Sequence, residues 1–299
     1  MKIAIDNPNA IQEMGSRKNQ EDSIFPLKGE ATVEDRVFIL CDGMGGHEKG
    51  EVASQLVCEV VSSYLHKNWT GGVLSDGLLN EALDEMFLRI NEYDNGTMRQ
   101  MGTTLTLVVF HQGGVTMAYI GDSRIYHVRP SEHRFLYKSR DHSLVYDLFL
   151  AGEIKQEEML SNARKNVITK AVTPNQEWQP NADIAHTTDV MAGDYFLLCS
   201  DGMLEQMDDQ QLLMILCGEE TDEQKCERLI RETKDNNDNH SAWLIKVNHV
   251  AAEPEDTAQP NDEHQTKSNA LLLERVSSPT QQDSDSLPFW TRVKNWFSL

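Results

Sequence analysis

The sequence predicts a mixed fold in which amphipathic helices cover sheets that are buried on both faces. Residues 37–41 and 195–200 are almost unbroken apolar runs, which are typical of strands with no face exposed to water. Residues 50–67 and 75–95 instead carry apolar side chains at helical spacing. Each of these two helices therefore has one apolar face that needs a sheet to cover.

Further strands and helices are expected along the chain. Residues 103–110 and 115–120 are rich in β-branched residues and are separated by a glycine-containing loop, so they predict a hairpin. Shorter strands are expected at residues 3–5, 125–128, 183–187 and 242–247, and helices at residues 144–150, 208–217 and 222–234.

The composition limits the class of protein. The 299 residues suffice for one domain of roughly 250 residues with an extension. A formal net charge of −21 argues against nucleic acid or an anionic membrane as the main partner of that domain. The five cysteines form no C-x-x-C pair, so neither a disulfide framework nor a zinc ribbon is predicted, and a reducing cytoplasm is expected. No signal-peptide core and no apolar run of membrane-spanning length is present.

Three aspartates stand at the ends of predicted strands. Two apolar runs each end in an Asp-Gly pair, at Asp42 and Asp201, and Asp238 comes shortly before the strand at 242–247. An unpaired carboxylate at the end of a buried strand is costly, and a divalent cation is the usual compensation. We therefore expect these carboxylates to meet at one end of a sheet. Asp235 competes with Asp238 on composition alone.

Other polar residues allow two interpretations each. Arg17, Glu21 and Asp22 form either a solvated charged loop or an arginine aimed at an anion beside a carboxylate aimed at a metal. Asp122 also follows an apolar strand, but Asp is common in turns, so the local pattern favours a turn. For His142, a capping or packing role is favoured over a catalytic one.

The chemistry that these residues suit is phosphoester hydrolysis. Asp42, Asp201 and Asp238, with Glu21 or Asp22, form an oxygen-rich set without convergent His or Cys, which selects Mg²⁺ or Mn²⁺. Two such ions bridged by one Asp can deprotonate a water, and a neighbouring Arg can hold a phosphoryl group. The chain has no C-x-x-x-x-x-R, no G-x-x-x-x-G-K-[ST] and no G-x-S-x-G motif, so thiol phosphatases, P-loop enzymes and serine hydrolases of those types are not predicted.

Seven motifs together resemble the PP2C (PPM) family of metal-dependent protein serine/threonine phosphatases, in its bacterial form. The resemblance covers about residues 10–248 and implies an α+β fold, an α-β-β-α sandwich of two antiparallel sheets flanked by helix pairs, with metals at one end between the sheets. The motifs are R-K-N-Q-E-D (17–22), C-D-G-M-G-G-H (41–47), M-G-T-T-L (101–105), Y-I-G-D-S-R-I-Y (119–126), R-D-H-S-L (140–144), S-D-G-M (200–203) and D-N-H-S (238–241).

The resemblance implies a role for each matching residue. Asp42 is expected to bridge two ions of Mn²⁺ or Mg²⁺, and Gly43 to offer its backbone carbonyl. Asp201 and Asp238 are expected to hold the first ion. Residues 145–175 correspond to a variable flap beside the site.

The remaining roles concern the second ion, a third ion and the substrate. Glu21 is expected to reach the second ion through its side chain or a water, with Asp22 beside it. Arg17 is expected to bind the substrate phosphate. Asp122 is expected to help Asp201 hold a third, weaker ion, as in bacterial members, which reverses the local preference for a plain turn.

The sequence departs from the family pattern in two places. Many eukaryotic members have His directly after the first Asp-Gly, where it is a proposed general acid, whereas this chain has Met44, as bacterial members often do. His47 lies three residues further on, and the identity of the acid stays open. The last motif reads D-N-H-S where D-N-I-T is commoner, but Asp238 is kept, so we expect the metal site to be kept.

The composition changes after the predicted catalytic domain at residues 1–249. Residues 250–286 are rich in Glu, Asp, Gln, Pro, Ser and Thr, which predicts a disordered acidic linker. Residues 287–299 carry aromatic side chains on one helical face and are too short to span a bilayer. This tail is expected to dock a partner, a membrane surface or its own domain.

The expected substrate is a phosphoprotein, and the expected partners are a Ser/Thr kinase or its targets, with no nucleic acid. A monomer in the cytoplasm is expected, with the tail as a peripheral membrane contact. Two rival functions stay open. A pseudophosphatase usually lacks a metal carboxylate, and none is missing here. A hydrolase of small phosphoesters would differ in the flap that selects the substrate, and the sequence of the flap does not indicate which substrate it selects.

Overall fold

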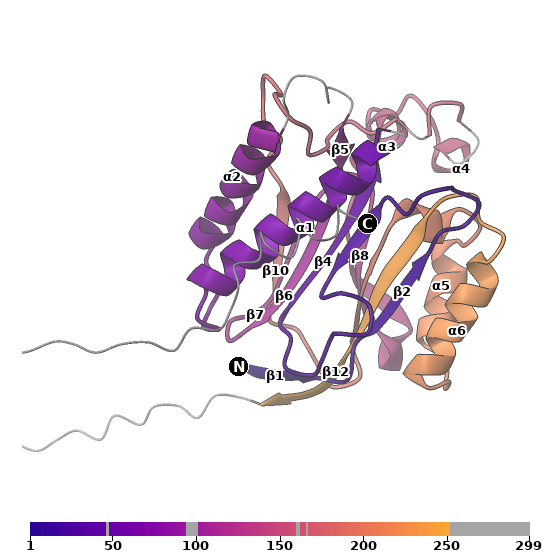
Figure 1. Cartoon of the computed structure of the whole chain (residues 1–299). Coiled ribbons are helices and arrows are strands. Elements are labelled where there is room, and N and C mark those ends of the chain that lie inside the picture. Colours follow the sequence, from indigo (N-terminus) through magenta and orange to yellow (C-terminus); the bar gives the residue numbers. More distant parts are fainter. Residues whose placement is uncertain (46–47, 94–100, 160–161, 166, 252–299) are drawn as a thin grey trace, which may run out of the picture. The chain divides into compact units, whose positions relative to one another are not determined.

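Two antiparallel sheets face each other, as a computed structural model that describes residues 1–45, 48–93, 101–159, 162–165 and 167–251 shows (Figure 1). The first sheet has the strand order β1 (Lys2–Ile5), β12 (His240–Ala251), β11 (Tyr195–Cys199), β8 (Arg124–Arg129) and β9 (Arg134–Lys138), and β2 (Asn9–Glu13) also pairs with β12. The second has the order β10 (Asp183–Thr187), β7 (Gly114–Ile120), β6 (Leu105–His111), β4 (Val37–Met44) and β3 (Asp22–Phe25), and β5 (Gly102–Thr103) pairs with β4.

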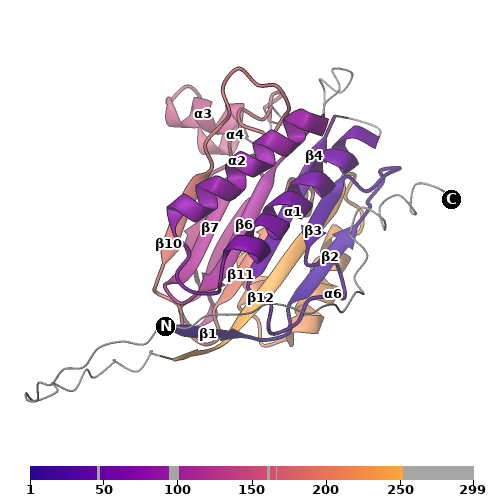
Figure 2. The ribbon, with the colours of Figure 1, turned by 60° about the vertical axis from the view of Figure 1, so that its left-hand side comes forward.

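A pair of helices covers the outer face of each sheet. Helices α1 (Glu48–Asn68) and α2 (Asp76–Tyr93) lie side by side over the second sheet (Figure 2). Helices α5 (Asp209–Leu216) and α6 (Asp222–Thr233) cover the first. The predicted α-β-β-α sandwich is therefore confirmed. Two shorter helices, α3 (Leu144–Leu150) and α4 (Gln156–Met159), and the 3-10 turns η1 (Pro130–Glu132) and η2 (Asp201–Leu204) complete the described elements.

Strand β4 has an unbroken apolar sequence before Asp42 because both of its faces are buried. Phe38 and Leu40 point between the sheets, where Phe38 meets Trp243 of β12 with ring centroids 5.4 Å apart. Ile39 and Cys41 point the other way and pack against α1 and α2. Both faces of the strand are thus apolar and buried, which removes the alternation that a half-exposed strand would show.

The structure contains strands that the sequence patterns did not predict. Strands β2 and β9 are two of them, and β12 runs from 240 to 251 rather than from 242 to 247. β9 is an edge strand whose residues are only half-buried or exposed, so its sequence lacks a strong apolar pattern. β4 also continues past Asp42, because Gly43 and Met44 pair with β5.

A buried ion network joins β8 to the turn before β11. The carboxylate of Asp194 accepts hydrogen bonds from Arg129 at 2.8 and 2.9 Å and bonds to His127 at 2.9 Å. Burial alone raises the pKa of Asp194, but its hydrogen bonds with His127 and Arg129 outweigh burial and lower that pKa to about 2. Arg129 also pairs with Asp189, whose side chain is 68% exposed. The two aspartates therefore offer a matched pair of substitutions.

We expect Asp194→Asn to lower the free energy of unfolding by about 3 kcal/mol, because it leaves a buried arginine without its buried partner. Asp189→Asn is the control and should cost about 1 kcal/mol or less, since the Asp189 side chain is largely exposed to water. Urea titrations at several pH values measure both. Because the folded pKa of Asp194 is lowered, its contribution is complete above pH ~4 and is lost as the pH falls toward about 2. Equal losses for the two variants would contradict this assignment.

Candidate active site

Five aspartates from the two sheets meet at one end of the sandwich. The second sheet supplies Asp42 of β4 and Asp22 of β3, which are direct cross-strand partners. The first sheet supplies Asp201, which begins η2 after β11, together with Asp238 just before β12 and Asp122 just before β8. Because β11 pairs with both β12 and β8 in antiparallel register, these three positions fall at the same end. We call these five residues the carboxylate cluster.

The carboxylates are close enough to perturb one another. Burial raises the pKa of Asp42 far above its usual range, and the charges of Asp22, Asp201, Asp122 and Asp238 raise it further. Burial likewise raises the pKa of Asp22 to about 7 and, with the Asp201 charge, that of Asp122 to about 8. Burial and the Asp238 charge raise the pKa of Asp201. Like charges held together in this way create a site that attracts cations.

Two threonines fix the backbone of Asp42. The Asp42 N–H donates to the Thr104 hydroxyl at 2.9 Å, and the Thr103 hydroxyl donates to the Asp42 carbonyl at 2.9 Å. Thr104 also bonds to the hydroxyl of Ser123, next to Asp122, at 2.8 Å. The M-G-T-T-L motif thus positions two of the carboxylates, a role that sequence analysis did not assign. Two adjacent threonines at the start of an apolar strand were the feature of the sequence from which this role could have been predicted.

Asp22 links the two sheets through hydrogen bonds to residues of the first sheet. The Ser200 hydroxyl donates to Asp22 Oδ2 at 2.9 Å and accepts from the Ser241 N–H. The other oxygen, Asp22 Oδ1, is buried and has no hydrogen-bond partner within the described structure. The Ser241 hydroxyl, which also lacks a hydrogen-bond partner in the described structure, is close enough to lower the pKa of Asp22. A carboxylate oxygen in this position could also bind a divalent ion or its water.

The backbone around Glu21 leaves no room for a side chain at position 43. The Glu21 carbonyl accepts from the Gly43 N–H at 3.0 Å and from the Ser54 hydroxyl at 2.6 Å. A Cβ at Gly43 would lie 2.2 Å from the Gly50 carbonyl oxygen. Glycine therefore lets β4, α1 and Glu21 approach one another, and the Glu21 carboxylate lies beside Gly50.

Arg17 lies against the cluster rather than apart from it. Its Nη2 donates to Asp238 Oδ2 at 2.6 Å, and both side chains are about half exposed. An exposed ion pair of this kind is worth about 1 kcal/mol or less. Arg17 is therefore held beside the cluster by a weak ion pair.

The structure distinguishes Asp238 from its competitor. Asp235 is exposed, lies 4.0 Å from Lys234, and is not among the charges that raise the pKa values of the cluster. The backbone before Asp238 is held by Glu205, whose carboxylate accepts from the Asn237 N–H at 2.6 Å and from the Asn237 side chain at 2.7 Å. Of the two, Asp238 is the one whose charge raises the pKa values of other aspartates in the cluster.

His142 has the packing role that its local sequence favoured. Its Nδ1 accepts the Gly121 N–H at 3.0 Å, and its ring stacks on Tyr119 with centroids 5.0 Å apart. The neighbouring Asp141 accepts two hydrogen bonds from Arg124, at 2.6 and 2.7 Å. The R-D-H-S-L motif thus fixes the turn that carries Asp122.

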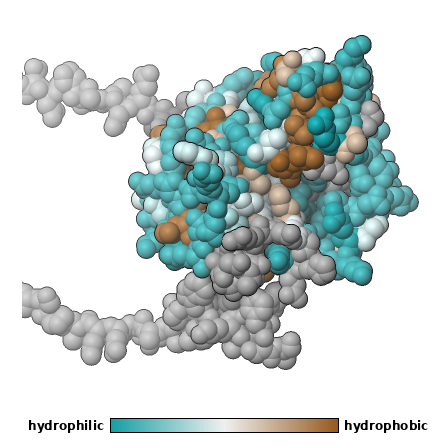
Figure 3. Space-filling model, turned by 90° about the horizontal axis from the view of Figure 1, so that it is seen from above, coloured by the Kyte–Doolittle hydropathy of each residue, from teal (hydrophilic) through white to brown (hydrophobic). Residues whose placement is uncertain are grey.

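The segment predicted as a flap lies at the same end of the sandwich. It contains α3 and α4, and its far side is joined to β5 through reciprocal hydrogen bonds between Thr103 and Val172. Apolar side chains of α3 such as Leu148 are only half-buried, and Leu150 is exposed. Figure 3 looks down on this end, where hydrophobic surface gathers on one side of an otherwise largely hydrophilic face.

The donor set fits a hard divalent ion, although no three described His, Cys, Asp or Glu side chains are arranged here as a complete metal site. The cluster offers carboxylate oxygens, a backbone carbonyl at Gly43 and the unsatisfied Asp22 Oδ1. Such oxygen ligands suit Mg²⁺ or Mn²⁺. Met44, which follows the first Asp-Gly pair, is half-buried, and His47 lies outside the described residues.

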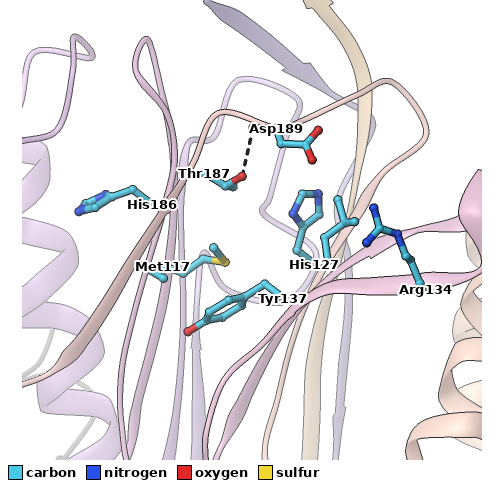
Figure 4. Close-up of a pocket in the computed structure, with 9 residues that line it drawn as sticks. Met117, His127, Arg134, Tyr137, His186, Thr187 and Asp189 are labelled. Atoms are coloured by element: carbon cyan, nitrogen blue, oxygen red, sulfur yellow. Dashed lines mark hydrogen bonds between the residues drawn. The ribbon is translucent and has the colours of Figure 1, made fainter.

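A cavity of about 260 Å³ lies elsewhere, between the edge strands β9 and β10 (Figure 4). Its charged lining residues already have partners: His127 with Asp194, Arg134 with Glu132, His186 with Asp76, and Asp189 with Arg129. None of the carboxylate cluster lines it. The cavity therefore offers no unpaired charge to a ligand, and the cluster remains the candidate site.

The sequence model of a family described as protein phosphatase 2C matches residues 16–244, and the chain belongs to that family, as its motifs predicted. The chain is 32% identical to protein phosphatase PhpP of Streptococcus pneumoniae over 228 residues, which cover 73% of this chain and 88% of PhpP. It is 31% identical to the serine/threonine phosphatase stp of Listeria innocua over 221 residues, covering 71% and 84% of the two chains.

Solved structures agree with the fold. The crystal structure of the serine/threonine phosphatase PstP/Ppp of Mycobacterium tuberculosis superposes with a TM-score of 0.70 at 31% identity, covering 83% of this chain and all of that one. A structure of the PstP catalytic domain in complex with two manganese ions superposes with a TM-score of 0.67 at 31% identity and the same coverage.

We expect Mn²⁺ to raise the melting temperature of protein that has been stripped with EDTA, because it neutralises repulsion within the carboxylate cluster. Differential scanning calorimetry measures the shift. The Asp42→Asn variant should show a much smaller shift with Mn²⁺, whereas Asp235→Asn should respond like the wild type. An Asp42→Asn shift equal to that of the wild type would contradict the site.

Proposed function

We propose that this chain hydrolyses phosphoserine and phosphothreonine in proteins with the help of Mn²⁺ or Mg²⁺ ions held by the carboxylate cluster. The chain is a member of a family of serine/threonine protein phosphatases, and its relative PstP binds two manganese ions. The observation that carries the proposal is five aspartates from two sheets at one end of the sandwich, with Arg17 beside them.

The residues divide into metal holders and a phosphate binder. In this proposal Asp42 and the Gly43 carbonyl would contribute to both metal positions, Asp201 and Asp238 would hold the first ion, and Glu21 would hold the second, through its side chain or a water. Bound divalent ions supply charge neutralisation and lower the pKa of water. The positive charge of the ions would then lie at the end of the sandwich where the two sheets meet.

The other residues orient the substrate and complete the cluster. Arg17 leaves Asp238 and donates two parallel hydrogen bonds to the phosphate dianion, a geometry that guanidinium suits. Asp22 stays between the sheets, with Ser200 on one oxygen and the second oxygen directed at the ions or their water. Asp122 and Asp201 provide a further, weaker position for a third ion.

Two alternative functions are less well supported. A pseudophosphatase is disfavoured because such proteins usually lack a metal carboxylate, and none of the family's is missing from this sequence. Hydrolysis of small phosphoesters is disfavoured by the family membership, since the relatives named above are protein phosphatases. The flap, with its half-exposed apolar helix α3, is the part of this chain that a protein substrate would contact first.

We expect Asp42→Asn to lower kcat on a phosphothreonine peptide by at least about a hundredfold, as loss of a charged group that stabilises the transition state does. The variant should keep its circular dichroism spectrum. Asp235→Asn, which removes a charge near but outside the cluster, should keep its kcat. Phosphate release in Mn²⁺ measures both. Full activity of the wild type after EDTA treatment would contradict the metal-dependent mechanism.

We also propose that the chain is a monomer in the cytoplasm. Its proposed substrates include a Ser/Thr kinase or the targets of that kinase. Residues 287–299 are proposed as a tethered docking element.

None of the described helices is both long and apolar enough to cross a membrane. The linker and the tail lie outside the described residues, and every proposed catalytic residue lies before residue 249.

Deleting residues 284–299 should leave activity on p-nitrophenyl phosphate unchanged, because the deletion removes none of the proposed site. Association with vesicles or with a kinase should weaken, because the aromatic face is lost. Sedimentation with vesicles and a kinase pull-down measure the two outcomes. Loss of Mn²⁺ binding in the truncated protein would show that the tail belongs to the catalytic domain.

A further inference from the structure

The side chain of Asn239 is almost completely buried between the carboxylate cluster and the loop that carries Arg17. Only 4% of Asn239 is exposed. Its Nδ2 donates to the carbonyls of Met14 at 2.9 Å and Asn19 at 3.0 Å, and its Oδ1 accepts the Glu21 N–H at 2.8 Å. All three partners are backbone groups of residues 14–21.

Asn239 therefore holds both ends of the loop at 14–19, and Arg17 lies between the two attachment points. The loop also touches the segment before β12 directly. The Ser16 N–H donates to the Asn237 carbonyl at 3.1 Å, and Gly15 has φ +59° with a position for Cβ only 2.2 Å from the Asp238 carbonyl oxygen. Figure 1 shows this loop, after β2, beside the start of β12.

The same residue also touches the metal side of the site. Its backbone N–H donates to Asp238 Oδ1 at 2.8 Å, while Arg17 donates to Oδ2 of the same carboxylate. Through the Glu21 N–H, Asn239 fixes the backbone whose carbonyl accepts the Gly43 N–H. Asn239 thus connects the proposed phosphate binder with the proposed metal ligands, through its side chain to Glu21 and through its backbone to Asp238.

Only asparagine supplies the groups that this position requires. Two carbonyls need two donors, and one N–H needs an acceptor, and the amide of Asn provides all three within a short side chain. Aspartate would turn a carboxylate toward two carbonyl oxygens, and alanine would leave three buried backbone groups without partners. This requirement also determines which way the amide faces, since the flipped amide would match none of the three.

We propose that Asn239 is a positioning residue that sets the distance between Arg17 and the carboxylate cluster, so that a phosphate bound to Arg17 lies at the metal site. The proposal rests on the function proposed above and adds the element that couples substrate binding to the metal site. Asn239 touches neither phosphate nor metal and acts through Arg17.

A double-mutant cycle between Asn239 and Arg17 tests this coupling, with KM for a phosphothreonine peptide measured in Mn²⁺. Arg17→Ala should raise KM. In the wild-type background Asn239→Ala should raise KM about tenfold, which corresponds to ~1.4 kcal/mol of lost binding. In the Arg17→Ala background the same change should raise KM less than about twofold, because the group it positions is already gone.

The matched control is Asn236→Ala. Asn236 is equally buried and lies three residues away, but its Nδ2 donates to the Gly202 carbonyl at 2.6 Å and not to the Arg17 loop. Its effect on KM should be the same in both backgrounds. Should Asn239→Ala fail to fold, Asn239→Ser, which keeps one hydrogen-bonding group, should show a smaller rise in KM with the same dependence on Arg17.

The measurements distinguish the positioning role of Asn239 from the proposed phosphatase function. Equal KM increases for the Asn239 variants with and without Arg17 would overturn the positioning role, and so would no KM change in the Arg17→Ala variant. Absence of any Mn²⁺-dependent phosphate release from the wild type would instead overturn the proposed function. Faster amide exchange at residues 14–21 in Asn239→Ala, with residues 200–204 unchanged, would support the proposal independently of activity.

Discussion

The main constraint on this structure is the repulsion among like charges at one end of the sandwich, where Asp22 and Asp122 are buried and Asp42, Asp201 and Asp238 are partly buried. Five aspartates reach one end of the sandwich, and burial and mutual repulsion raise the pKa values of Asp42, Asp22, Asp122 and Asp201. Such a cluster destabilises the protein unless cations compensate it. The surrounding structure is built to hold the charges in place, through threonine hydroxyls on the Asp42 backbone and a serine hydroxyl on Asp22.

The sandwich explains how residues far apart in sequence form one site. Each sheet is antiparallel, so the end of one strand and the start of its neighbour lie together. Asp201 after β11 and Asp238 before β12 meet in this way, as do Asp42 and Asp22 on β4 and β3. The aromatic core between the sheets, where Phe38 packs on Trp243, keeps the two halves of the site at a fixed separation.

The sequence predicted the elements whose pattern is strong and missed those whose pattern depends on tertiary contacts. The strand before Asp42 was predictable because both of its faces are apolar. The helices that cover it were predictable because their apolar residues recur at helical spacing. Edge strand β9 was not, because its side chains are half exposed. Among the site residues, Asp42, Asp201 and Asp238 were predicted from their place at strand ends, whereas the metal role of Asp122 and the choice of Asp238 over Asp235 came from the resemblance to the family. The roles of Thr103, Thr104 and Asn239 are hydrogen bonds to distant backbone, which no local pattern reveals.

The central claim is that the carboxylate cluster binds divalent ions, and anomalous diffraction from crystals grown in Mn²⁺ tests it most directly. The account predicts strong manganese peaks within about 2–2.5 Å of oxygens of Asp42, Asp201 and Asp238, the range for hard divalent cations on oxygen ligands. It also predicts that Arg17 has moved off Asp238. Manganese bound only outside the cluster, with Arg17 still paired to Asp238, would contradict the account.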